Sequence, residues 1–249
     1  MLTVWNAPIS RSTMDIDLLG RLNNNMNDII NIIKNICTQE GFINDGIVYQ
    51  PDSVSGERIT EDADYEGIRI KFQGVLDTAR FNMQLDIGFG DIIVPQAGPI
   101  DFPTILDLPC PCLLGYSIES IIAEKFEAMV KLGKINSRMK DFHDILMLSR
   151  QFDFDGQALS EAVRTTFSNR GTLISANPTA LTAEFAADAD KNTQWKAFLR
   201  KSQLVDMPED FFKTAEEIKT FLGPIAKSLS RNKSFLMAWK APGPWKDRN

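Results

Sequence analysis

The sequence of 249 residues predicts a mixed α+β fold, with a strand-rich part followed by a helix-rich part. Short β-branched or aromatic segments of alternating polarity predominate before about residue 95. Beyond Gly115, apolar residues recur at helical spacing instead. A proline-rich segment separates the two patterns, so we expect a sheet-containing domain over residues 1–110 and a helical domain over residues 111–249.

The strand-rich part begins with Ser12–Leu19, where polar and apolar residues alternate as in a short strand. Apolar residues at helical spacing then predict a helix over residues 22–37, which Gly41 ends. Turn-prone residues separate the next predicted strands, which are Gly46–Tyr49, Gly67–Phe72 and Phe81–Ile87.

The segment Pro95–Pro111 contains five prolines, which makes it a poor helix and a poor central strand, so we expect a connector there. Ser117 is a suitable N-cap for a helix that ends at Gly133, and a second helix is expected from Arg138 to Arg150. Weaker helical patterns cover residues 156–168, 179–188, 193–202 and 208–221.

The composition excludes several classes of protein. With 33 acidic and 27 basic residues, the net charge of −6 argues against coating nucleic acid by bulk electrostatics, although a local basic groove is compatible with it. No apolar stretch is long enough to span a membrane, and residues 1–6 do not begin a signal peptide. The three cysteines are too few for a disulfide framework, so we expect a cytoplasmic protein.

Three carboxylates are candidates for a metal site. Asp15 and Asp17 are two apart on a predicted strand, so both side chains project from one face, where hard oxygens suit Mg²⁺. Asp86 stands between Leu85 and Ile87, where an unpaired acid is costly to bury. A metal shared by all three would suit two-metal phosphoryl or nucleotidyl transfer. The alternatives are solvated strand-end acids and, for Asp86, a hydrogen bond to a turn.

Lys125 is the main candidate for binding phosphate, because its ammonium can reach a triphosphate from an amphipathic helix. The alternative is an ordinary surface lysine. Asp141 is either a general base or a partner that positions Lys125. His143, the only histidine, has apolar neighbours typical of a half-buried helix residue.

Other charged residues of this region have the spacing of helix-face ion pairs. Arg138 and Asp141 are three apart, and Lys140 and Asp144 are four apart. The sequence contains neither a G-x-x-x-x-G-K-[ST] loop nor a G-x-G-x-x-G fingerprint, which excludes P-loop and Rossmann nucleotide sites. Cys110 and Cys112 have no second cysteine pair that would complete a zinc site.

Four blocks of the sequence together resemble the nucleotidyltransferase toxins of the AbiEii/AbiGii type, whose relatives include the MenT-type tRNA-modifying toxins. The order and spacing of the blocks carry the resemblance. They are Arg11-Ser-Thr13-Met-Asp15-Ile-Asp17; Tyr65–Arg69 with Leu85–Asp91; Ile118–Lys125; and Arg138-Met-Lys140-Asp141-Phe142-His143-Asp144-Ile145.

The resemblance implies a polymerase-β-type nucleotidyltransferase core with a mixed sheet, followed by the helical C-terminal half. It implies that Asp15, Asp17 and Asp86 hold Mg²⁺, that Lys125 contacts the phosphates of an NTP, and that Asp141 is required for activity. Nucleotide contacts are implied for Thr13, Lys125, Arg138 and Lys140. The implied partners are an RNA acceptor, for which the 3′ end of tRNA is the first candidate, and a cognate antitoxin protein.

The sequence departs from the family pattern in one respect. Members have a glycine-containing element upstream of the paired aspartates, and residues 1–14 contain none, so we expect an N-terminal truncation and weakened nucleotide binding. Two alternatives to an RNA-modifying enzyme stay open. One is a catalytically impaired remnant that binds nucleotide or an antitoxin, and the other is an enzyme that nucleotidylates proteins.

Overall fold

The computed structural model describes Val4 and residues 16–39, 45–62, 65–104, 106–204 and 207–248, with the backbone alone for residues 60–62, 65 and 66. The chain divides into two compact units: a sheet unit, Thr13–Asp91, and a helical unit, Ile92–Asn249, to which Met1–Ser12 are assigned. The expected division near residue 110 falls inside the helical unit. The predicted mixed α+β class with a mixed sheet is confirmed.

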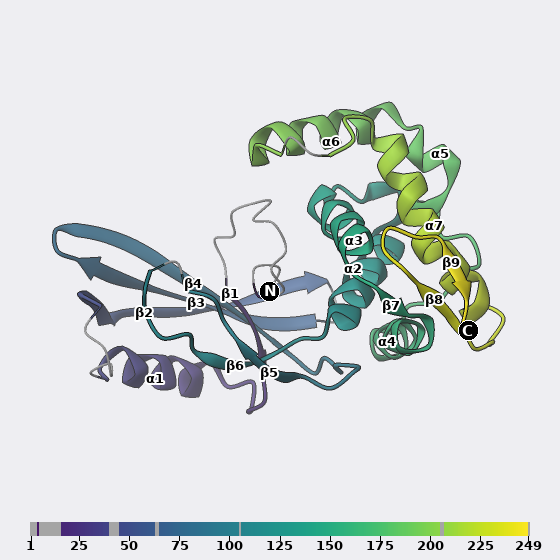
Figure 1. Ribbon diagram of the computed structural model, residues 1–249. Coiled ribbons are helices and arrows are strands. Elements are labelled where there is room, and N and C mark those ends of the chain that lie inside the picture. The colour runs from purple at the N-terminus through teal and green to yellow at the C-terminus, as the bar shows by residue number, and fades with distance from the viewer. Residues whose placement is uncertain are drawn as a thin grey trace. The chain divides into compact units, whose positions relative to one another are not determined.

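The sheet unit consists of a four-stranded sheet with one helix against it (Figure 1). Its strands are β1 (Ile16–Gly20), β2 (Ile47–Asp62), β3 (Tyr65–Leu76) and β4 (Ala79–Phe89), and its helix is α1 (Met26–Cys37). The strand order is β1-β4-β3-β2; β1 runs parallel to β4, and the remaining neighbours are antiparallel. The sheet is therefore mixed, with β1 and β2 at its edges.

Alternation along the strands gives the sheet an apolar face and a polar face. Ile68, Ile70 and Ile87 are buried in one small core with Ile29 and Ile33 of α1. The residues between them in β3 and β4 project from the opposite face. Helix α1 starts at Met26, later than the periodicity predicts, because the Asn25 side chain caps it by accepting hydrogen bonds from the first turn.

Strand β2 is much longer than the predicted strand Gly46–Tyr49 and runs through Pro51. Proline cannot donate to a ladder, so it is confined to edge strands and bulges. Both conditions hold here, because β2 is an edge strand and its register with β3 shifts between Gln50 and Ser55.

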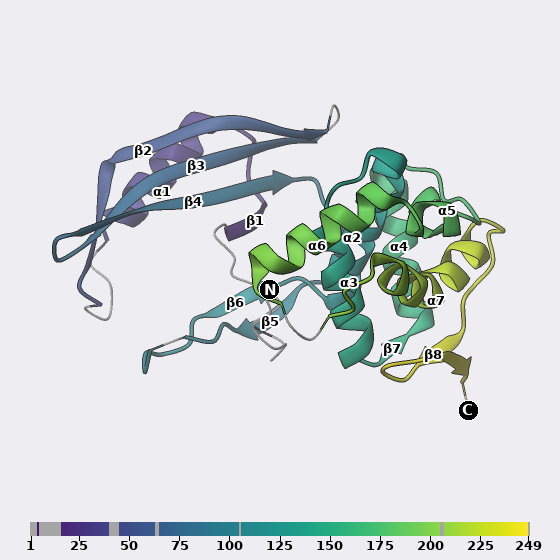
Figure 2. The ribbon, with the colours of Figure 1, turned by 90° about the horizontal axis from the view of Figure 1, so that it is seen from above.

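The helical unit has a separate and larger apolar core, whose biggest members include Trp195, Phe126, Phe142 and Phe221. Figure 2 shows its helices, which are α2 (Ile118–Leu132), α3 (Met139–Gln151), α4 (Gly156–Asn169), α5 (Ala183–Ala186), α6 (Ala189–Ser202) and α7 (Phe211–Leu229). Its small sheet has the order β7 (Phe154–Asp155), β8 (Met237–Trp239) and β9 (Trp245–Asp247). No helix of the described residues is both long and apolar enough to cross a membrane.

The predicted boundaries of α2 are confirmed. The Ser117 hydroxyl accepts a hydrogen bond from the Ser120 backbone N–H at 3.1 Å, and Gly133 ends the helix at φ +50°, a value that favours glycine. Ser120 is buried, and its hydroxyl both accepts from the Val94 N–H and donates to the Val94 carbonyl, each at 2.9 Å. These bonds fasten the incoming chain to the first turn of α2.

The proline-rich segment is not a plain connector, because it contains one strand of a two-stranded antiparallel ribbon, and the other strand follows directly after Pro111. Strand β5 (Gly98–Asp101) pairs with β6 (Cys112–Gly115), and Pro99 lies opposite Leu114. A two-stranded ribbon leaves each strand with an open edge, which is where a strand tolerates proline.

Candidate functional site

Two of the predicted carboxylates lie side by side in the sheet unit. Asp17 of β1 is the direct register partner of Asp86 of β4. Directly paired residues project from the same face, and this face is the polar one, opposite α1. Asp17 is exposed and Asp86 is largely covered. The expectation that Asp17 and Asp86 converge on adjacent strands agrees with this register.

Asp86 has an ionic partner that the sequence analysis did not assign. Arg69 lies directly opposite it on β3 and donates two hydrogen bonds, from Nε to Oδ1 at 2.8 Å and from Nη2 to Oδ2 at 2.7 Å. Such a bidentate pair is among the stronger charge-assisted arrangements. The side chain of Asp86 is 17% exposed, so Arg69 accounts for its burial without a metal ion.

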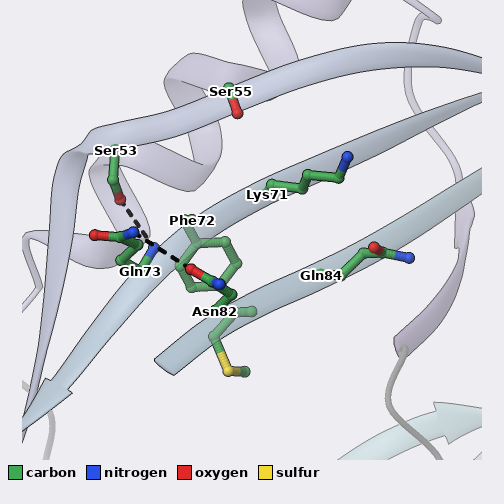
Figure 3. A pocket seen from close by; sticks show the side chains of 8 residues that line it. Ser53, Ser55, Lys71, Phe72, Gln73, Asn82 and Gln84 are labelled. Carbon is green, nitrogen blue, oxygen red and sulfur yellow. Dashed lines mark hydrogen bonds between the residues drawn. The ribbon is translucent and has the colours of Figure 1, made fainter. Parts of the chain in front are cut away.

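Beyond this pair, the polar face continues along the strands into a shallow hollow (Figure 3). Phe72 and Met83 contribute apolar surface to its lining, amides and hydroxyls supply most of its polar groups, and the Gln73 amide donates to Asn82 across β3 and β4. Its one ammonium, Lys71, is paired with Glu57 at 2.7 Å. The polar lining consists of Ser53, Ser55, Lys71, Gln73, Asn82 and Gln84. The hollow thus offers neutral hydrogen-bonding groups next to the carboxylates.

The carboxylates of the polar face fit a hard divalent cation. Asp17 and Asp86 supply oxygen donors from adjacent strands. Both oxygens of Asp86 already accept from Arg69 and, at 3.4 Å, from the Gln84 amide. Asp15 and Thr13 lie outside the described residues, which by themselves contain no group of three side chains able to hold a metal. The predicted three-carboxylate Mg²⁺ site therefore stays a prediction.

Lys125 of α2 is not a surface lysine. Its ammonium lies 3.0 Å from Oδ1 of Asp141 and 2.8 Å from Oδ2 of Asp144, and both carboxylates belong to α3. The Lys125 side chain is 18% exposed, and the two carboxylates are buried. Two of the three N–H bonds of the ammonium are directed at these acids, which leaves one for a phosphate oxygen.

The surroundings keep Lys125 charged. Burial alone would lower its pKa, but the nearby charges of Asp144 and Asp141, with their hydrogen bonds, outweigh burial and raise the pKa above the ordinary lysine value. At neutral pH the side chain is therefore a cation that can bind an anion, and it is not a proton acceptor.

Asp141 is completely buried, and both of its oxygens are occupied. Oδ1 accepts from Lys125, and Oδ2 accepts from Nε of Arg138 at 2.7 Å. The predicted Arg138–Asp141 ion pair is therefore present. Of the two roles considered for Asp141, this environment favours the partner that positions Lys125 over the general base.

Asp144 and His143 differ from their predicted environments. Asp144 does not form the expected helix-face pair with Lys140, which is exposed; it pairs with Lys125 of the neighbouring helix. His143 is fully buried instead of half-buried, and its Nδ1 lies 3.0 Å from Oδ1 of Asp144. The same turn of α3 therefore brings Asp141 and Asp144 to Lys125.

Sequence analysis assigned no role to Arg69, and it paired Asp144 with Lys140 instead of Lys125. A local signal existed for Asp144, because acids three apart on a helix share a face, which here is turned to α2. No local signal identified Arg69, because its partner follows 17 residues later and depends on the register of β3 and β4. Asp17 and Asp86 lie in the sheet unit, whereas Lys125, Arg138, Lys140 and Asp141 lie in the helical unit.

Comparison with known families gives one match over most of the chain. The model described as nucleotidyl transferase AbiEii toxin, type IV TA system, matches residues 1–218. Comparison with curated proteins gives no match. Two solved Helicobacter pylori structures are similar. One, titled as a candidate nucleotidyltransferase, has 16% identity, covers 93% of this chain and 83% of its own, and has a TM-score of 0.45. The other, JHP933, has 14% identity, coverages of 93% and 82%, and a TM-score of 0.44.

Proposed function

Because the chain belongs to the AbiEii nucleotidyl transferase toxin family of type IV toxin–antitoxin systems, we propose that it transfers a nucleoside monophosphate from an NTP to RNA. The 3′ end of tRNA is the first candidate acceptor. The family assignment makes the chain a transferase and implies an antitoxin as its partner. The observation that supports the reaction best is the register pairing of Asp17 with Asp86 on the polar face.

In the proposed reaction, a hydroxyl of the acceptor attacks the α-phosphorus of the NTP. A phosphorus–oxygen bond to the acceptor forms, and the bond from the α-phosphorus to the bridging oxygen of the β-phosphate breaks. Pyrophosphate leaves with that bond's electron pair, and the proton of the attacking hydroxyl passes to water. Asp15, Asp17 and Asp86 would hold Mg²⁺, which when bound supplies positive charge to the phosphates and to the attacking and leaving oxygens. Arg69 holds Asp86 in one orientation through its two hydrogen bonds.

Lys125 would contact the phosphates of the nucleotide. Its raised pKa keeps it cationic, and its partial exposure leaves the ammonium within reach of a ligand. Arg138, Lys140 and Thr13 are the further nucleotide contacts that we propose. Arg138 is partly exposed and Lys140 is exposed, as a phosphate contact requires, whereas Asp141 acts by holding Lys125 and Arg138.

The experiment that tests the function uses each α-³²P-labelled NTP in turn, with Mg²⁺ and total tRNA. We expect label on tRNA from the wild-type protein, and loss of at least about a hundredfold for the Asp15→Ala/Asp17→Ala variant, because charge stabilisation at the transferred group is lost. The matched control is Asp52→Ala, which removes an exposed carboxylate of β2 from the same unit and should retain wild-type transfer.

Each other outcome has a definite meaning. Full transfer by the double variant would refute the proposed catalytic role of the two aspartates. Label on protein instead of RNA would indicate a protein-nucleotidylating enzyme. A folded wild-type protein that labels neither tRNA nor protein with any NTP would contradict the transfer reaction and favour the impaired remnant.

A further inference from the structure

A chain of charged and polar side chains in the helical unit ends at the only histidine of the sequence. Lys125 lies at its centre, between Asp141 and Asp144. Each carboxylate gives one oxygen to the lysine and its other oxygen to a donor on α3. For Asp141 the donor is Arg138, at 2.7 Å, and for Asp144 it is His143, at 3.0 Å. His143 thus has the same place beside Asp144 that Arg138 has beside Asp141.

The direction of the His143 contact follows from the chemistry of its partner. An ionised carboxylate only accepts hydrogen bonds, so the Nδ1 that faces Asp144 must carry the hydrogen. The imidazole is completely buried and lies against the ring of Phe198, with 5.7 Å between ring centroids. Its Nε2 has no hydrogen-bond partner among the described residues. Among the described residues, the ring therefore makes its hydrogen bond to Asp144, through Nδ1.

A second donor matters for Asp144 because its terminal torsion is soft. Rotation about the Cβ–Cγ bond of an aspartate is broad and roughly two-fold, so a single hydrogen bond does not define the plane of the carboxylate. With Oδ1 held by His143, Oδ2 stays 2.8 Å from the Lys125 ammonium. Loss of that bond removes one of the donors that hold the plane of the carboxylate, so the ammonium is positioned less firmly.

We propose that His143 is a positioning residue for nucleotidyl transfer, acting on Lys125 through Asp144. It touches neither nucleotide nor acceptor; it holds the carboxylate that aims the ammonium at the phosphates. This inference rests on the proposed function, because it assumes that Lys125 binds the nucleotide. The positioning of Lys125 by itself can be measured without any transfer reaction.

Two variants of nearly equal shape distinguish the effect of losing the hydrogen-bond donor from the effect of losing the volume of the ring. His143→Asn keeps an N–H donor close to the position of Nδ1, whereas His143→Leu has a similar branched shape and no donor. Both leave a comparable void beside Phe198, so the lost packing is matched. Far-UV circular dichroism and thermal unfolding show whether both variants are folded.

The first measurement is the rate at which acetic anhydride modifies Lys125, read by mass spectrometry against exposed Lys134 of the same molecule. We expect Lys125 to react about fivefold faster in His143→Leu than in the wild type, and His143→Asn to lie within about twofold of the wild type, as loss of one hydrogen bond predicts. Equal rates in the two variants would overturn the positioning role.

The second measurement uses the wild-type chain and so does not depend on how the variants fold. Because the sequence has one histidine, ¹⁵N-histidine labelling gives one imidazole spin system. We expect the hydrogen on Nδ1, protected from exchange by burial. A hydrogen found on Nε2, with Nδ1 unprotonated, would rule out donation to Asp144.

The third measurement is transfer itself. We expect kcat/KM for the NTP to fall about tenfold in His143→Leu and to recover in His143→Asn, with KM for the RNA acceptor unchanged. In an Asp144→Asn background, His143→Leu should have no further effect; an undiminished effect there would contradict action through Asp144. If the wild type transfers nothing, the proposed function fails, while the labelling rates still decide whether His143 positions Lys125.

Discussion

At the scale of single residues, Lys125 joins two buried carboxylates, so its removal affects stability as well as binding. We expect Lys125→Met to lower the free energy of unfolding by about 3–5 kcal/mol, because Asp141 and Asp144 lose the ammonium that offsets their charge. Urea unfolding at pH 7.5 measures the loss. The matched control is Lys134→Met, whose exposed pair with Glu184 should contribute less than about 1 kcal/mol.

The raised pKa of Lys125 also sets the sign of its pH dependence. A group whose folded pKa lies above its unfolded value contributes its full stabilisation below the unfolded pKa and loses it as the pH rises through the folded pKa. The unfolded value for lysine is about 10.4. We therefore expect wild-type stability to fall more steeply than that of Lys125→Met above about pH 10.4. The free energy of unfolding of both proteins is measured by urea titration from pH 8 to 11. An equal decline with pH in the two proteins would contradict this.

The residues that the sequence identifies and those that it misses differ in a physical way. Asp86 is recognisable because a charged group between apolar neighbours needs compensation. Lys125 is recognisable because it belongs to the Ile118–Lys125 block that carries the family resemblance. Asp141 was identified as a possible partner of Lys125, but the partnerships of Arg69 and Asp144 were not. Arg69 reaches Asp86 through strand register, and Asp144 reaches Lys125 through the packing of two helices. Both partnerships depend on tertiary structure, which a local pattern does not contain.

At the scale of elements, the first turn of α2 depends on a serine that lies inside it. Ser120→Ala would remove both hydrogen bonds to Val94 and leave its N–H and carbonyl without these partners. We expect a loss of about 1–3 kcal/mol in the free energy of unfolding, measured by urea titration. Ser230→Ala, at an exposed site in the same unit, should change it by less than about 0.5 kcal/mol. Equal effects of the two substitutions would refute this anchoring role.

The elements that the sequence predicts well are those with local signals at their ends. Helix α2 has a capping serine and a terminating glycine, and its bounds agree with expectation. The β5–β6 ribbon was missed because prolines argue against a central strand. In the structure, β5 and β6 pair only with each other, so neither is a central strand. The extension of β2 past Pro51 was missed because edge position and bulges become visible only with the partner strand.

At the scale of the whole molecule, the two units have separate apolar cores, so we expect them to respond separately to core substitutions. Trp195, Trp239 and Trp245 all belong to the core of the helical unit. In a Trp5→Phe background, tryptophan fluorescence then reports on that unit, whereas far-UV circular dichroism also reports on the sheet unit.

The test compares one core substitution in each unit. Ile70→Ala should cost about 2–5 kcal/mol in the sheet unit, and should shift the urea transition seen by circular dichroism without moving the fluorescence midpoint. Leu222→Ala, in the core of the helical unit, should shift the fluorescence midpoint. A fluorescence midpoint that moves equally with Ile70→Ala would show that the two units unfold as one.

The pair of Arg69 and Asp86 also bears on how the sheet selects one alignment of its strands. Slipping β4 by a single residue against β3 would turn Asp86 toward α1 and Ile87 toward water. A slip of one residue puts arginine and aspartate on opposite faces of the sheet, so that alignment loses both hydrogen bonds together. The carboxylate that the proposed chemistry needs therefore also favours the native register, together with the buried isoleucines of the same strands, so one contact contributes both to the candidate site and to the alignment of the sheet.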